Sequence, residues 1–535
     1  EMWYYDTRNS EGNLAGKRQT FRKTVEYENL QDQYRKYFLQ VTLDWRRGFG
    51  RGHNLFALAH YEMSDQKSAK SATDSMAAIP VRYQGISAKL SYNYKEIYLL
   101  DSNFGYTGSE NFQPGRQFGL FPSVSGGWVP SNHNWFKGRL PWFNYLKIRA
   151  SYGLVGNDRL SNKRFPYLTT IRQGSHRTIW GYVGAVWEDV IGADNLKWEK
   201  AKKFDVGLEG KLFDKFDFVI DYFRDTRDGI FQERRQVPDF VGLVNMPFGN
   251  VGSMVSWGAD GNFTFNHRIN KDLDFTIRGN FTYSTNKVNY FEEADTKYEY
   301  MSASGRPWGY TRGYIALGLF RDQEEIDNSP IQKFGEYMPG DIKYKDVNGD
   351  GIVDSDDQVP LSYSDFPRFM YGLGLEFHWK KLTLGVLFKG IGNSDYYRIW
   401  TDPNSTSNNA GFMPFYAGET GNILAIAKNP RNRWIPADYN DPSIPAELRE
   451  NPNAMFPRLS YGKNENNTQT STFWKGNRKY LRLDEISLYY NLDPLILKRI
   501  GINGIELGLV ATNLYTWDNA VSYTHLRAHE TDQYL

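Results

Sequence analysis

Hydrophobic and polar residues alternate along many segments of this chain. In Leu39–Arg46 (LQVTLDWR), every second residue is hydrophobic and the residues between them are polar. Successive side chains of a β-strand point to opposite faces, so this pattern predicts strands with one hydrophobic face. No segment of comparable length shows a helical periodicity stronger than this alternation. The same alternation returns most clearly in residues 257–266, 273–283, 369–377 and 382–388.

The predicted strands pair into hairpins, and the connections between strands fall into a short and a long class. We count about 14 strands of about ten residues each. Short turns are expected at residues 48–52, 95–96, 213–215, 267–272 and 378–381. Much longer connections are expected at residues 155–201, 287–367 and 393–479. Short turns at one rim and long loops at the other are typical of an outer-membrane β-barrel. Long loops without structure of their own would be unusual in a soluble domain.

The composition agrees with a β-rich chain, and the small net charge does not favour a highly charged partner. Among 535 residues there are 37 Tyr, 34 Phe, 15 Trp and 49 Gly, which favour strands and tight turns over helices. The net charge is only +2, from 64 basic and 62 acidic residues, so nothing favours nucleic acid as a partner. Cysteine is absent, which excludes disulfides and thiolate metal sites. No run of 18 apolar residues predicts a transmembrane helix.

One loop carries the spacing of a calcium site. Residues 346–357 read DVNGDGIVDSDD, and oxygen ligands recur there at the positions a calcium loop uses. The predicted metal ligands are Asp346, Asn348, Asp350, Asp354 and Asp357 through their side chains, and Ile352 through its backbone carbonyl. The last ligand is Asp where Glu is usual, so we expect weak binding. The alternative is a turn in which Asp and Asn bond their own backbone without metal.

We find no pattern that predicts catalysis. The chain has no HExxH, nucleophile elbow or phosphate-binding loop, and His is scarce. Four carboxylates at strand spacing, Asp205, Glu209, Asp217 and Asp221, could be read as a glycosidase pair. The polar wall of a barrel lumen explains them better. The chain is therefore predicted not to be an enzyme.

Several stretches together resemble the SusC-like, starch-utilisation type of TonB-dependent outer-membrane transporter. They are FPSVSGGW (121–128), LKIRASYG (146–153), NLKWEK (195–200), GDIKYKDVNGDG (340–351), FPR (456–458), YLRL (480–483) and NLYTW (513–517). Singly each is weak, but in this order they are specific. The resemblance implies a large antiparallel transmembrane barrel of about 22 strands with long extracellular loops. It also implies that the protein is located in the cell outer membrane of a Gram-negative, Bacteroidota-like organism.

The resemblance further implies a function and its partners. A SusC-like protein imports glycan or peptide oligomers with energy from TonB and works with a SusD-like surface lipoprotein. Outer-membrane lipid surrounds such a barrel. The alternative from another class is a secreted, calcium-stabilised β-rich glycan-binding protein or glycoside hydrolase.

The resemblance also sets expectations for the organisation of the chain. Residues 1–36 are expected to be a loop or partial strand region, and residues 37–519 part of the barrel. The plug domain and TonB box of the family have no counterpart in the sequence. About eight of the family's strands are unaccounted for, so we expect an incomplete barrel. Residues 520–535 lack both alternation and the family's aromatic finish and are interpreted as non-native sequence.

Overall fold

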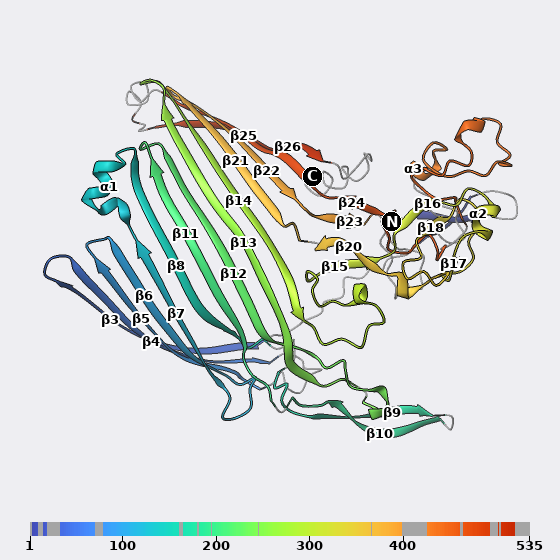
Figure 1. Ribbon diagram of the computed structural model, residues 1–535, viewed down its shortest axis with the longest axis horizontal. Helices are drawn as coiled ribbons and strands as arrows, with labels where there is room; N and C mark the ends of the chain where they lie inside the picture. Colours follow the sequence, from blue (N-terminus) through green and yellow to red (C-terminus); the bar gives the residue numbers. More distant parts are fainter. Residues whose placement is uncertain are drawn as a thin grey trace.

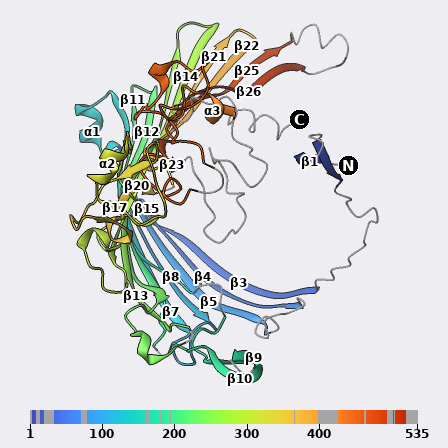
Figure 2. The same cartoon turned by 90° about the vertical axis from the view of Figure 1, so that its right-hand side faces the viewer.

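One curved antiparallel sheet dominates the computed structural model (Figure 1). The structure describes residues 3–8, 14–18, 33–69, 79–159, 164–178, 181–193, 195–243, 245–364, 366–397, 425–460, 464–492, 501 and 504–518. The sheet has 14 strands, which confirms the number predicted from alternation. Seen from the side that carries the long loops, it bends into an open arc (Figure 2).

Each strand of this sheet is hydrogen-bonded to the sheet strands that come immediately before and after it along the chain. The first seven strands, in chain order, are β3 (Gln33–Phe49), β4 (His53–Ala69), β5 (Val81–Tyr94), β6 (Tyr98–Ser109), β7 (Phe118–Trp128), β8 (Phe143–Asn157) and β11 (Glu199–Leu212). The other seven are β12 (Phe216–Glu233), β13 (Phe248–Arg268), β14 (Leu273–Tyr290), β21 (Phe369–Trp379), β22 (Leu382–Gly392), β25 (Tyr480–Asn491) and β26 (Glu506–Asp518). Strands β3 and β26 are the two ends of the sheet and do not pair with each other, so the barrel is open, as expected.

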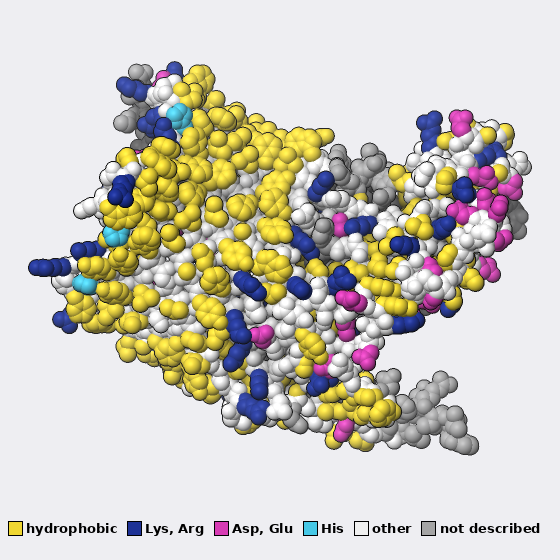
Figure 3. All heavy atoms as spheres, viewed as in Figure 1, with side chains coloured by type: hydrophobic (Ala, Val, Ile, Leu, Met, Phe, Trp, Pro, Cys, Tyr) yellow, Lys and Arg dark blue, Asp and Glu magenta, His cyan; other side chains and the backbone are white. Residues whose placement is uncertain are grey.

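The register places hydrophobic side chains on one face across neighbouring strands. Leu208 of β11 lies opposite Ile148 of β8 and Ile220 of β12, and all three side chains are exposed. Because side chains alternate along a strand, a shift by one residue would exchange the two faces. The convex face therefore carries a broad hydrophobic surface (Figure 3). Water is a poor solvent for such a surface, whereas lipid hydrocarbon suits it.

The turns and the loops are separated between the two rims, as predicted. Two-residue turns at Lys95–Glu96 and Phe213–Asp214 have φ between 51° and 58° at both positions. Positive φ at both central residues defines the type I′ turn, whose twist matches that of the flanking strands. A longer link at this rim contains α1 (Asn134–Arg139). The strands span 11 to 21 residues, longer than the ten expected, and β13 is the longest.

The long connections are folded, which alternation along the chain did not predict. The β8–β11 connection contains a hairpin of β9 (Thr170–Thr178) and β10 (Gly181–Val190). The β14–β21 connection contains β15 (Tyr310–Gly313), β16 (Ala316–Leu319), α2 (Gln323–Asp327), β17 (Ile331–Gln332), β18 (Ile342–Tyr344), β19 (Ile352–Val353) and β20 (Val359–Ser364). The β22–β25 connection contains β23 (Asp395–Tyr397), α3 (Ala425–Lys428) and β24 (Lys475–Asn477).

The two largest connections build one common hydrophobic core. We call the assembly of residues 310–364 with the described residues of 425–477 the loop unit. Tyr344 and Val353 of the first connection are buried with Phe456 and Trp474 of the second. A bridge between Tyr314 and Ser471 joins their backbones. The buried apolar core of the described chain therefore lies chiefly outside the sheet.

A buried ion pair also holds the two connections together. Asp341, whose side chain is fully buried, accepts a hydrogen bond from Arg458 Nη2 on its Oδ2 at 3.0 Å, across 117 residues of sequence. Asn467 Nδ2 donates to the same carboxylate at 2.7 Å, and the Met338 N–H donates at 2.9 Å. The Asp341 carboxylate thus has partners from both connections, and its Oδ2 binds groups of both. A charge buried in this way is stable only while its partners remain.

Outside the sheet, residues 1–36 include a strand pair of their own. A loop or partial strand region was expected, and the structure places a hairpin of β1 (Trp3–Arg8) and β2 (Leu14–Arg18) there. Residues 520–535 lie outside the described residues, so their interpretation as non-native stays a prediction. No helix among the described residues is long and apolar enough to cross a membrane.

Replacing Asp341 should loosen the loop unit while the sheet still assembles. In Asp341→Ala, Arg458 keeps its charge but loses its buried partner, which we expect to destabilise the unit by about 3 kcal/mol or more. The measurement is amide hydrogen exchange of residues 310–364 and 433–474 in the full-length protein. Glu324→Ala removes an exposed carboxylate of α2 and is the matched control. Unchanged exchange in Asp341→Ala would show that the two connections are stable separately.

Candidate functional site

The concave face of the sheet carries a cluster of charged side chains centred on Arg149. Its Nη1 lies 3.1 Å from Asp205 Oδ1, its Nε 3.0 Å from Glu209 Oε1, and its Nη2 2.7 Å from Asp221 Oδ2. Lys147 Nζ donates to the same Glu209 oxygen at 3.0 Å. Three strands, β8, β11 and β12, contribute these residues. Their side chains are in phase with one another and opposite in phase to the exposed Leu208 and Ile148.

A glycine makes room for this cluster. Gly207 of β11 lies directly between Arg149 and Asp221 in the cross-strand register. A Cβ at this position would lie 2.1 Å from Asp221 Oδ1 and 2.8 Å from Arg149 Cζ. Any larger residue would therefore force the guanidinium and the carboxylate apart. Local sequence thus allows an ion pair across two strand spacings.

The arrangement does not resemble a glycosidase pair. Asp205, Glu209 and Asp221 all contact the Arg149 guanidinium, and Asp217 pairs separately with Lys211 at 3.5 Å. A hydrolase needs one carboxyl group held as an acid and a second held as a base or nucleophile. Here a single cation holds three carboxylates in ion pairs. Of the two readings of these residues, the polar wall fits the contacts better.

Two shallow cavities lie on the concave face. One of about 270 Å³ lies against Asp101, Ser125, Lys147 and Arg149, next to Gly127. The other, of about 320 Å³, is lined by Arg278, Glu376, Glu485, Ser487 and Tyr489 among others. Both offer charged and hydroxyl groups that donate and accept hydrogen bonds. Such a wall can contact a polar solute at many points without a deep specific pocket.

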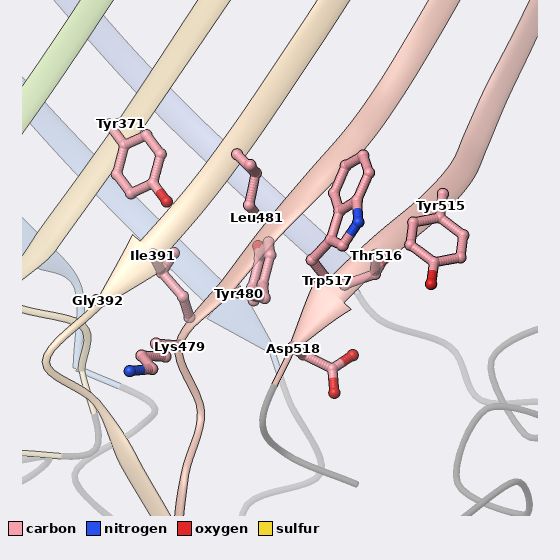
Figure 4. A pocket seen from close by; sticks show the side chains of 10 residues that line it. All are labelled: Tyr371, Ile391, Gly392, Lys479, Tyr480, Leu481, Tyr515, Thr516, Trp517 and Asp518. Carbon is pink, nitrogen blue, oxygen red and sulfur yellow. The ribbon is translucent and has the colours of Figure 1, made fainter. Parts of the chain in front are cut away.

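A third cavity, of about 540 Å³, lies at the long-loop ends of β22, β25 and β26 (Figure 4). Tyr371, Tyr480, Tyr515 and Trp517 line it, and the Tyr515 and Trp517 rings meet edge to face at 4.8 Å between centroids. Lys479 and Asp518 lie at its end (Figure 4). Tyr and Trp at strand ends are typical of the membrane–water interface, where one end of the ring is apolar and the other wet.

The predicted calcium loop lies in the loop unit, and backbone groups occupy its oxygens. Asp346 accepts from the Gly349 and Gly351 N–H groups at 2.6 and 2.8 Å. Asn348 and Asp350 each accept from the N–H two residues on, at 3.0 and 2.9 Å. Gly349 and Gly351 have φ of 77° and 83°, which explains glycine at both positions. The loop therefore closes through Asx turns.

The second half of the loop is held in the same way. Asp357 is fully buried and accepts from the Val347 N–H at 2.7 Å and from the Asp354 N–H at 2.8 Å. Asp354 caps the short 3₁₀ helix Ser355–Asp357 and accepts from the Asp356 N–H, and this bond lowers the pKa of Asp354. Ile352 instead pairs with β17 as the first residue of β19. The sequence thus placed these side chains in one loop, and its turn alternative predicted that they bond to nearby backbone.

Calcium binding remains a prediction. Within the described ranges, no group of three His, Cys, Asp or Glu side chains is arranged to hold a metal ion. The donors are nevertheless all oxygens, which Ca²⁺ prefers, and a carboxylate oxygen that accepts one N–H keeps a second lone pair. Lys297 and Lys333 pair with Asp356 and Asp354 at the edge of the loop. The donor chemistry fits a hard cation, and the backbone bonds fit the turn alternative.

Sequence reasoning missed Arg149 and Lys147, although it singled out the carboxylates they bind. Both lie in the stretch 146–153, and both alternate with hydrophobic Leu146 and Ile148. Alternation could therefore have placed them on the polar face. It could not show that Arg149 lies opposite Gly207, because the register between two strands cannot be predicted from the sequence of one of them.

Comparison with known proteins identifies the family. A family model described as "TonB dependent receptor-like, beta-barrel" matches residues 2–430. TonB-dependent receptor P26 of Formosa agariphila is 25% identical over 449 residues, which cover 81% of this chain and 41% of the relative. TonB-dependent receptor SusC of Bacteroides thetaiotaomicron is 22% identical over 490 residues, which cover 86% of this chain and 45% of SusC. The chain thus spans less than half the length of these relatives.

Solved structures agree on the fold. The structure of the RagAB peptide transporter superposes with a TM-score of 0.67 at 17% identity, over 92% of this chain and 52% of that one. The RagAB peptide importer in its "closed-closed" state gives a TM-score of 0.65. Family, relatives and fold place this protein in the outer membrane. The chain is similar to SusC, as its sequence motifs predicted, and it belongs to the TonB-dependent receptor β-barrel family.

Proposed function

We propose that the full-length protein imports oligomeric nutrients, glycan or peptide, across the outer membrane with energy from TonB. The observation that carries this proposal is the two-faced sheet, whose convex face is hydrophobic and whose concave face is lined by hydrogen-bonding and charged groups. Such a wall suits a solute rich in hydroxyl or amide groups. Among solved neighbours, RagAB is described as a peptide importer, which supports the peptide alternative.

A surface lipoprotein of the SusD type is the proposed partner. The loop unit supports this, because two connections locked by a buried ion pair present one rigid surface on the long-loop rim. A rigid surface loses little conformational entropy when it binds a second protein. Secreted glycan binding or hydrolysis, the other class considered, is less well supported, because it leaves the broad hydrophobic convex face without a role.

Uptake in living cells tests this function. In a strain that lacks the gene, import of a fluorescent oligosaccharide pool and of a fluorescent peptide pool would be compared with the parent strain. We expect one pool to fail to enter, and an uncoupler of the proton gradient to reduce the parent to the same level. Equal uptake of both pools in parent and deletion strain would contradict the proposal.

The orientation of the barrel gives a second test. We propose that the long loops are extracellular and the short turns periplasmic. A peptide tag inserted at Thr296, in the β14–β21 connection, should be labelled on intact cells that express the full-length protein. A tag at Asn270, in the turn between β13 and β14, should be labelled only after permeabilisation. The reverse result would invert the orientation.

We propose that the 346–357 loop binds calcium weakly, with a Kd on the order of 10⁻⁴ to 10⁻³ M, as extracellular calcium modules do. Bound calcium would order the loop and would supply no chemistry. The test is trypsin cleavage after the exposed Lys345 in the full-length protein. We expect calcium to protect the wild type, and Asp346→Ala with Asp350→Ala to abolish that protection.

The matched control for the calcium test is Glu324→Ala with Asp327→Ala. These two exposed carboxylates lie on α2, outside the loop, and their removal changes the net charge equally. The control should keep calcium protection. Cleavage at the same rate in calcium and in chelator would show that the loop is only a turn.

A further inference from the structure

Basic side chains gather along one border of the hydrophobic convex surface. Figure 3 shows Lys and Arg in a narrow band where this surface gives way to the part of the molecule that bears the long loops. On β11, β12 and β14, the cations that point outward are Lys200, Lys202, Arg224 and Lys287. We call these four residues the basic band. Each is exposed.

The basic band belongs to the convex face by its phase along the strands. Lys202 is two residues from Phe204 and four from Val206, both exposed on the convex face. Arg224 is two residues from the exposed Tyr222, and Lys287 is four from the exposed Tyr283. Their neighbour Lys203 points to the concave face, where it pairs with Asp225 at 3.0 Å. Adjacent lysines therefore serve opposite faces.

The basic band is arranged across several strands. Lys202 lies opposite Thr226, Thr226 opposite Val255, and Val255 opposite Lys287. Three strand spacings separate Lys202 from Lys287, or roughly 14 Å. Arg224 lies between them along the sheet and directly opposite Phe204 and Trp257. The cations thus surround a patch that also offers aromatic rings.

Positive charge on the basic band is only partly neutralised. Lys202 pairs with Asp228 at 2.9 Å. Lys200, Arg224 and Lys287 form no ion pair with any residue that the structure describes. Elsewhere on the convex face, Arg82 forms an ion pair with Asp65 at 2.9 Å. Some cations on this face are therefore paired with a carboxylate of the sheet itself, unlike these three. Three cations without an ion pair among the described residues thus lie beside a hydrophobic surface, and only Lys200 has a carboxylate, Asp228, opposite it in the register, so an anionic partner would complement them.

We propose that the basic band binds the phosphorylated headgroups of lipids in the outer leaflet. This border is where the hydrophobic surface ends, which is the depth of lipid headgroups around a barrel. Acyl chains would lie on Phe204, Val206 and Tyr222, while phosphate groups would meet Arg224 and the lysines. A guanidinium binds phosphate with two parallel hydrogen bonds, and ammonium groups add point charges. Clusters of cations near a membrane surface attract anionic lipid.

Lipid binding by the full-length protein tests this proposal. The protein, purified in dodecyl maltoside, would be titrated with monophosphoryl lipid A and with the same lipid after removal of its phosphate, and bound lipid counted by native mass spectrometry. We expect the wild type to prefer the phosphorylated lipid by about tenfold or more, since each cation near an anionic surface adds a factor of about five. Equal binding of the two lipids would overturn the proposal, as would be found if the basic band served an acidic protein.

Matched variants assign the preference to the basic band. Lys200→Gln with Arg224→Gln and Lys287→Gln should lose it. Lys203→Gln with Arg278→Gln and Lys389→Gln removes equal charge from exposed concave-face residues and should keep it. Lys200→Arg with Arg224→Lys and Lys287→Arg preserves charge and should also keep it. If the first of these variants, which lacks the charges of Lys200, Arg224 and Lys287, binds the two lipids like the wild type, the proposal is overturned. If that variant fails to assemble, the comparison of the two lipids on wild type still decides.

Discussion

The need to pair every backbone N–H and C=O group in a medium without water determines this structure. Within lipid hydrocarbon an unpaired peptide group has no substitute partner, so strands must form continuous ladders. Each of the 14 strands pairs with its neighbour along the sheet, and the outer edges of β3 and β26 have no partner strand in this described sheet. The ladder then fixes which side chains face outward, since a slip by one residue would exchange both faces. The hydrophobic convex face and the polar concave face follow from that register.

Glycine has a distinct use in each part of this architecture. On the wall, Gly207 leaves the space that the Arg149–Asp221 pair fills between strands. In the loop unit, Gly349 and Gly351 take up positive φ, so that Asp346 can accept two backbone N–H groups. The first use is steric and acts across strands, whereas the second is conformational and acts within one turn. The abundance of glycine in the composition therefore has more than one cause.

The loop unit follows the opposite rule from the sheet. Its core of Tyr344, Phe456 and Trp474 is buried inward, as in a soluble domain, and burial raises the pKa of the Tyr344 phenol, which stays a neutral donor to Asn466 O. The Asp341–Arg458 pair then links two connections that are far apart in sequence. A rigid loop structure on the rim, a polar wall below it and a basic band beside it are thus three separate surfaces.

The sequence by itself determined the strands, their number, the separation of short turns from long connections and the family, because alternation with a period of two is a local property. Its turn residues also placed the 346–357 loop, whose Asp and Asn side chains bond to nearby backbone. Only the tertiary structure decided that Arg149 gathers Asp205, Glu209 and Asp221, and that Asp341 meets Arg458. These contacts depend on the register between strands and on the docking of distant loops, and neither is encoded in the spacing of residues along one segment.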